Sequence, residues 1–184
     1  MTDRIQWATM VCRSACVALA LAVGGCERKA QPPAMVAAGE FEGSWNAAGT
    51  RRSIPLGPDR KGSIIDLRGT MLLAGAGRPG VGFRAEVIAL TDSETGVVGR
   101  GVWTDERGDE VYSELKGEGT KERNRIVGTI LGGTGRYGGA TGTYEFSWQF
   151  IIESEDGSIQ GRAEGLKGRY RLGPPAAEPG GAKR

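Results

Sequence analysis

Apolar and polar residues alternate along the middle of the chain, which is the pattern of β-strands rather than helices. The clearest example is a set of apolar side chains at every second position, formed by Tyr144, Phe146, Trp148, Phe150 and Ile152. Polar residues occupy most positions between them, so this strand has one apolar face. An Asp156-Gly157 pair follows, which is typical of a two-residue hairpin turn, and the chain then returns as another strand.

Turn signals rich in Gly, Pro and Asp divide the middle of the chain into short alternating segments. They predict strands near 40–48, 63–74, 82–91, 96–104, 110–118, 125–132, 143–153 and 158–171. Eight strands with short connections indicate an antiparallel meander in a single all-β domain. We expect the meander to close as an eight-stranded antiparallel barrel, because closure removes the unpaired edges of a sheet.

The first part of the chain has the pattern of a secretory signal. Arg4 and Arg13 precede an apolar stretch at 15–23, which is shorter than the roughly 20 apolar residues that cross a bilayer. The Val23-Gly24-Gly25-Cys26 ending resembles the lipobox of bacterial lipoproteins. This resemblance implies cleavage before Cys26 and attachment of several acyl chains to it, which together anchor a protein stably. The alternative is a buried N-terminal helix with an incidental cysteine.

These signals divide the chain into four predicted parts. They are a lipoprotein signal peptide at 1–25, a lipidated cysteine with a flexible tether at 26–38, a barrel domain at 39–172 and a disordered tail at 173–184. The resemblance implies a lipid-anchored protein of the bacterial cell envelope that faces the periplasm. The residue after the cysteine is Glu27 rather than Asp, which favours the outer membrane.

Composition narrows the classes of function. The chain of 184 residues has 24 basic and 22 acidic side chains, so it lacks the basic excess typical of nucleic-acid binding. It contains no histidine, and its last cysteine is Cys26. The commonest general base and the commonest metal ligands are therefore missing from the predicted domain. We expect no metal, no cofactor and no serine-hydrolase chemistry.

A glycine-rich segment at 132–142 matches G-x-G-x-x-G, the spacing of a dinucleotide-binding loop. Such a loop needs a helix after it, because the helix N-terminus holds the phosphates. A strand pattern follows here instead, which favours a tight connection between two strands. In this interpretation Gly133, Gly135 and Gly142 allow unusual backbone angles or close approach, and Tyr137 folds back to plug one end of the barrel.

The same segment carries a resemblance to a known family. The residues 130–142, ILGGTGRYGGATG, resemble the G-G-[ST]-G-x-[FY]-x-x-A-x-G segment shared by allene oxide cyclases and dirigent proteins. The resemblance is best over about 127–146. It implies an eight-stranded antiparallel barrel of the calycin-like type. It also implies a shaped cavity that holds an apolar molecule, because both families work largely by positioning such a molecule.

Candidate site residues follow from the barrel prediction, since a barrel of eight strands can hold one small ligand. Trp45 and Trp103 are candidate pocket walls, although tryptophan in a strand also serves as core. Polar residues flanked by apolar ones are candidates for the lumen, where they would have to be paired: Glu86, Arg100, Glu114, Arg162 and Glu164. The alternative is that these five lie on the solvated outer face.

Three functions remain open from the sequence. The first is a binder of a small apolar or amphipathic molecule in the lumen. The second is an isomerase or cyclase that positions an apolar substrate. The third is a structural envelope module with a filled barrel, whose aromatic face makes a homo-oligomer. The size of the cavity separates the third from the other two.

Overall fold

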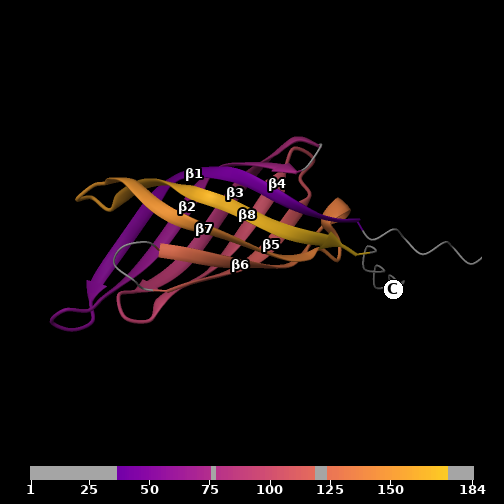
Figure 1. Ribbon diagram of the computed structural model, residues 1–184. Helices are drawn as coiled ribbons and strands as arrows, with labels where there is room; N and C mark the ends of the chain where they lie inside the picture. Colours follow the sequence, from indigo (N-terminus) through magenta and orange to yellow (C-terminus); the bar gives the residue numbers. More distant parts are fainter. Residues whose placement is uncertain (1–36, 76–77, 119–123, 174–184) are drawn as a thin grey trace, which may run out of the picture. The chain divides into compact units, whose positions relative to one another are not determined.

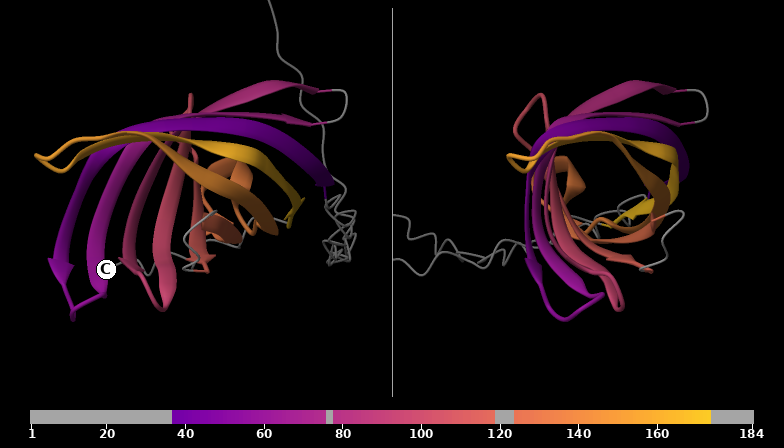
Figure 2. Two further views of the ribbon diagram at one scale, coloured as in Figure 1. Left: turned by 60° about the vertical axis from the view of Figure 1, so that its left-hand side comes forward. Right: turned by 90° about the vertical axis from the view of Figure 1, so that its left-hand side faces the viewer.

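The computed structural model of the protein describes residues 37–75, 78–118 and 124–173. They form one closed barrel in which eight antiparallel strands follow each other in chain order and the last strand pairs with the first. Figure 1 shows the strands side by side, and the right-hand view of Figure 2 shows the ring that they make. The prediction of an all-β, closed eight-stranded antiparallel barrel is confirmed. Among the described residues, no helix is long and apolar enough to cross a membrane.

The strands run close to their predicted limits. They are β1 (Ala37–Pro55), β2 (Lys61–Gly75), β3 (Arg78–Asp92), β4 (Gly96–Asp105), β5 (Glu110–Gly117), β6 (Asn124–Gly133), β7 (Thr141–Glu153) and β8 (Ser158–Leu172). The largest difference is in β1, which continues past residue 48. Arg51, Arg52 and Ser53 near its end are polar, but they pair in register with β2 and extend the hairpin beyond the apolar core.

Alternation sorts the side chains into an inner and an outer face. The inner face holds buried residues from every strand, among them Trp45, Leu67, Val87, Trp103, Leu115, Ile130, Phe146 and Ile159. The aromatic residues of β7 belong to this inner set, since Tyr144 and Phe146 are buried and Trp148 and Phe150 pack against the core. The aromatic face therefore points into the lumen and is not available as a contact surface between subunits.

The inward pattern changes phase once along β8. Ala163 and Leu166 both face inward although three positions separate them. The pairing with β1 shifts at the same place, and Gly165 has a φ of +63°. This is a β-bulge, in which one extra residue exchanges the inner and outer sets beyond it.

The barrel has two different ends. We call the end with the connections at 56–60, 93–95 and 154–157 the mouth. At the other end, the plug end, Ala37 pairs with Leu172, and the short 3-10 helix η1 (Gly135–Tyr137) lies between β6 and β7. Figure 1 shows η1 and the terminal parts of β1 and β8 on the same side of the barrel.

The glycine-rich segment is the tight connection that the sequence predicts. Gly133 ends β6, and Gly135 has a φ of +48° at the start of η1. Tyr137 folds over the plug end, and its ring lies 5.8 Å from that of Phe83 on β3. Gly142 is the exception. It is not in the turn but inside β7, where its position paired with Tyr170 leaves no space for a side chain beside the backbone of β8.

Candidate ligand site in the barrel lumen

An aromatic cluster fills the middle of the lumen. Trp103 and Tyr144 lie 4.9 Å apart between ring centroids, and Phe146 stacks beside Tyr144 at 6.2 Å. The Tyr144 hydroxyl donates a hydrogen bond of 2.8 Å to Ser113 Oγ, so this buried polar group is satisfied. Burial raises the pKa of Tyr144 above its usual value, which keeps the phenol neutral. The cluster separates two cavities that share no lining residue.

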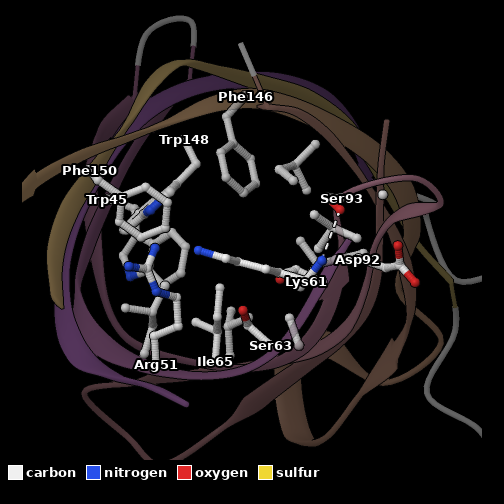
Figure 3. A pocket seen from close by; sticks show the side chains of 18 residues that line it. Trp45, Arg51, Lys61, Ser63, Ile65, Asp92, Ser93, Phe146, Trp148 and Phe150 are labelled. Carbon is white, nitrogen blue, oxygen red and sulfur yellow. Dashed lines mark hydrogen bonds between the residues drawn. The ribbon is translucent and has the colours of Figure 1, made fainter. Parts of the chain in front are cut away.

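The larger apolar cavity opens at the mouth and has a volume of about 310 Å³. We call it the mouth pocket. One wall is aromatic: Trp45 and Trp148 lie 4.9 Å apart, and Phe150 meets Trp148 edge-on at 6.0 Å. The other wall is aliphatic and comes mainly from β2 and β3, with Ile65, Leu67, Val87 and Ala89. Figure 3 shows these side chains around the opening.

The rim of the mouth pocket is polar and carries two cations, Arg51 and Lys61. The Arg51 guanidinium makes an ion pair of 2.6 Å with Glu153, and its Cζ lies 5.5 Å from the ring centroid of Phe150. Figure 3 shows the Lys61 side chain reaching across the opening toward Trp45 and Arg51. Charged nitrogens therefore stand directly over an apolar and aromatic interior.

The single carboxylate that lines the rim among the described residues is Asp92, and Arg60 holds it. Arg60 Nη2 lies 2.6 Å from Asp92 Oδ2, and the backbone N–H of Glu94 donates to Asp92 Oδ1 at 2.9 Å. The hydrogen bond from Arg60, followed by that from Glu94, lowers the pKa of Asp92 to about 2. The carboxylate is thus already neutralised by its own arginine.

The second cavity lies at the plug end and has a volume of about 240 Å³. It is lined by Phe41, Phe83, Trp103, Tyr137 and Tyr170, among others. Burial raises the pKa of Tyr137 to about 12. The segment that carries Tyr137 is fastened to the end of β4, because Arg136 Nη2 lies 2.5 Å from Asp105 Oδ2 in an ion pair that is not aligned as a hydrogen bond.

Asp105 is the one buried acid among the described residues. Burial alone would raise its pKa, but the backbone N–H groups of Arg107 and Asp109 donate to its Oδ1 and Arg136 lies against its Oδ2. Together these partners outweigh burial and lower the pKa of the Asp105 carboxyl. Asp105 therefore serves the β4–β5 turn and the anchoring of η1.

The structure sorts the predicted site residues into two groups. Trp45 and Trp103 face the lumen, as expected, Trp45 in the mouth pocket and Trp103 in the plug-end cavity. The five polar candidates do not line the lumen but follow the alternative that the sequence left open, the solvated outer face. They project from the outer face because each stands one position away from an inward residue, and they pair there with charged groups of their own or a neighbouring strand: Glu86, Arg100, Glu114, Arg162 and Glu164.

These outer pairs form short ladders across adjacent strands. Glu86 lies 3.3 Å from Arg84 and 3.7 Å from Arg68, and Glu114 lies 3.5 Å from Arg100. Arg162 donates to Gln149 on β7 and to Glu164 on its own strand. Exposed ion pairs of this kind contribute little to stability. They lie on the outer face, away from both cavities of the lumen.

Sequence reasoning missed the two cations of the rim. The signal was present, because Arg51 follows Trp45, Ala47 and Gly49 at steps of two, and Lys61 and Ser63 precede Ile65 at the same step. Both are therefore on the inward-facing phase of their strands. They went unnoticed because the apolar alternation stops before it reaches them. Cys26 lies outside the described residues, as do all but the first residue of the predicted tail.

Within the described parts of the chain, no three acidic or other metal-ligating side chains come together as a candidate metal site. The chain matches no protein-family model, and searches of curated proteins and of solved structures found no significant match. The class of the protein is therefore defined by its own geometry, as a closed eight-stranded antiparallel barrel. Within that class, its particular feature is a pocket with an aromatic wall and a cationic rim.

Proposed function

We propose that the barrel binds a small apolar or amphipathic molecule in the mouth pocket, and that the domain is lipid-anchored through Cys26 and faces the periplasm. The observation that carries the binding proposal is the open, largely apolar cavity of about 310 Å³ beside Trp45, Trp148 and Phe150. Its volume lies at the lower end of the range of small-molecule sites, roughly 300–1,000 Å³. Apolar walls with a few polar groups at the rim are typical of such sites.

Binding is favoured over catalysis by the position of the polar groups in the lumen. Tyr144 and Ser113 are hydrogen-bonded to each other in the aromatic cluster and line neither cavity. Among the described residues of the mouth pocket there is no glutamate, and Asp92 is held by Arg60. An isomerase that moves a proton needs a general acid or base within the apolar interior, whereas the ionisable groups of this pocket, Arg51, Lys61 and Asp92, stand at its rim.

The proposal is tested by filling the pocket. Ala89 is 6% exposed and lies on the aliphatic wall, so Ala89→Phe should occupy the space of the ligand. The probe is N-phenyl-1-naphthylamine, an uncharged dye whose fluorescence rises in apolar surroundings. We expect Ala89→Phe to weaken its binding by about tenfold or more.

The matched control is Leu72→Phe on the outer face of β2, where the Leu72 side chain is 54% exposed. It should leave dye binding unchanged. If the Ala89→Phe variant binds the dye as tightly as the original protein, the dye binds elsewhere and the proposal for the mouth pocket loses its support. Both variants are compared in the full chain carrying Cys26→Ser, with thermal unfolding as a check of folding.

A further inference from the structure

The chemical class of the ligand can be inferred from the rim, and this inference rests on the proposed binding function. We infer that the mouth pocket takes a planar organic acid. Its acid group lies between Lys61 and Arg51, and its ring lies against the aromatic wall formed by Trp148 and Phe150.

The backbone of Lys61 is held firmly at the rim. Its N–H donates to Ser93 Oγ at 3.2 Å, and its carbonyl accepts a hydrogen bond of 3.1 Å from the Ser93 N–H. These two bonds join the start of β2 to the β3–β4 turn. They fix the inward phase of Lys61, so its side chain crosses the opening in Figure 3 rather than extending along the surface.

Lys61 is the cation of the rim that has no carboxylate partner among the described residues. The carboxylates around it already have arginine partners: Asp92 and Glu94 lie against Arg60, and Glu153 lies against Arg51. No ion pair joins Lys61 to a carboxylate of the described residues. Because acidic partners at the rim are neutralised, an incoming anion meets the Lys61 ammonium with little competition, and the low-dielectric wall strengthens that attraction.

The shape of the interior favours a flat molecule. The cavity lies between the aromatic side chains of β1 and β7 and the aliphatic side chains of β2 and β3. Aromatic faces gain most from a flat partner that stacks on them or meets them edge-on. A cationic ligand is disfavoured, because it would have to pass Lys61 and Arg51.

The experiment compares two probes that share one ring system and differ in charge, 2-naphthoate and 2-naphthalenemethanol. Binding is followed by quenching of tryptophan fluorescence, since Trp45 and Trp148 line the pocket. We expect the acid to bind about tenfold more tightly than the alcohol at low salt, and the preference to shrink as salt rises. Lys61→Met keeps the apolar stem and should remove most of the preference, whereas Lys61→Arg should keep it.

The control variant is Lys167→Met, which removes a lysine from the outer face, where it pairs with Glu145 at 3.3 Å. It should leave the preference intact. Equal affinity for acid and alcohol, with dye binding retained, would overturn the inference of an acid and leave the binding proposal standing. Absence of binding by both probes and by the dye would overturn both. Tighter binding of laurate than of 2-naphthoate would overturn the planar part.

A separate observation concerns the outer face of β2, β3 and β4. Ile88 and Leu90 are the most exposed large apolar side chains of the described residues, each 64% exposed. The register places Leu90 between Ile64 and Val98 in one row, and it places Ile88 between Asp66 and Arg100 in the next. We call this surface the β3 face. Ile88 and Leu90 both lie on β3, the middle strand of this surface.

We propose that the β3 face binds a second copy of this chain through a twofold axis running along β3. This rotation places β2 of one copy opposite β4 of the other within the same row. Asp66, which lies 3.6 Å from Arg68 in its own copy, then faces Arg100 of the other copy, and the same contact occurs a second time by symmetry. Arg100 lies 3.5 Å from Glu114 in its own copy, so the contact adds a partner to each group. Leu90 and Ile88 meet their own equivalents on the axis. Within this row the order acid, aliphatic, base is complementary to itself, and Glu86, the next outward residue of β3, is paired with Arg84 and Arg68 of its own copy.

Charge exchange tests this contact by sedimentation of the full chain carrying Cys26→Ser. We expect a dimer that Asp66→Arg or Arg100→Asp alone weakens by about tenfold, and that the two changes together restore. Val127→Lys on the outer face of β6 is the control and should leave the dimer unchanged. A monomer at every concentration would overturn the proposal. Monomers that bind anionic vesicles through Leu90 would instead assign the β3 face to a membrane surface.

Discussion

At the scale of single residues, Asp92 combines three tasks at the rim. It ends β3, accepts the N–H groups of Glu94 and Thr95 in the following turn, and forms the ion pair with Arg60. The pKa of Asp92 is lowered to about 2, well below the usual value of about 3.9 for an unfolded chain. A carboxyl with a lowered pKa stabilises the fold at pH values above the unfolded pKa, and that contribution disappears as the pH falls toward the folded pKa.

Asp92→Asn should therefore lower the stability of the barrel near neutral pH and have progressively less effect between about pH 4 and pH 2. The measurement is thermal unfolding of both proteins over this range. Glu94→Gln is a suitable control, because Glu94 pairs with the same arginine but accepts no turn hydrogen bond. A constant difference between Asp92→Asn and the original protein down to pH 2 would show that the lost interaction is not linked to the charge.

At the scale of elements, the strands were predictable because their apolar alternation survives almost to their ends. The predicted strand at 110–118 differs from β5 by a single residue, and the predicted start of 96–104 coincides with that of β4. The inward direction was not predictable from alternation alone, since either face of a closed sheet can be apolar. The polar candidates failed for this reason: Glu86 and Arg100 have the right spacing but stand on the outward phase.

A change in the alternation of inward and outward residues also limited what could be predicted from the sequence. The bulge at Gly165 moves the inward set of β8 from the odd to the even positions, so Leu166 follows Ala163 into the lumen. If strict alternation is assumed to continue past Gly165, the residues in the second half of β8 are assigned to the wrong face of the barrel. A glycine within a strand signals such a bulge, but β8 contains three glycines, Gly161, Gly165 and Gly168, and only Gly165 has a positive φ.

The role of Gly135 in the connection between β6 and β7 can be tested by substitution. Gly135 has a φ of +48°, and a Cβ there would lie 1.9 Å from Asp109 Oδ1. The Asp109 carboxylate accepts the Arg136 N–H at 3.2 Å, so a side chain at residue 135 would displace it from η1. Gly135→Ala should lower the free energy of unfolding by about 2 kcal/mol or more, measured by chemical denaturation.

The comparison variant is Gly108→Ala in the β4–β5 turn. Gly108 also has a positive φ, +84°, but a Cβ there would meet nothing within 4 Å. It should cost only the backbone strain, about 1 kcal/mol. Equal losses in the two variants would mean that the Asp109 contact does not hold η1 in place.

At the scale of the whole molecule, the proposed anchor makes its own prediction. Cys26→Ser should abolish labelling by a fatty-acid probe and block processing of the N-terminus. The protein should then no longer fractionate as a processed lipoprotein. Cys16→Ser, inside the predicted signal peptide, should leave labelling unchanged. Unchanged labelling and membrane extraction of the Cys26→Ser protein would contradict lipid attachment at this residue.

The mouth pocket and the paired residues Ala37 of β1 and Leu172 of β8 lie at opposite ends of the barrel. Ala37 and Leu172 are paired at the plug end, while Lys61 and Arg51 stand at the mouth. The chain therefore enters the barrel at the end opposite the pocket. A small molecule can reach the mouth pocket without passing the point where the chain enters the barrel.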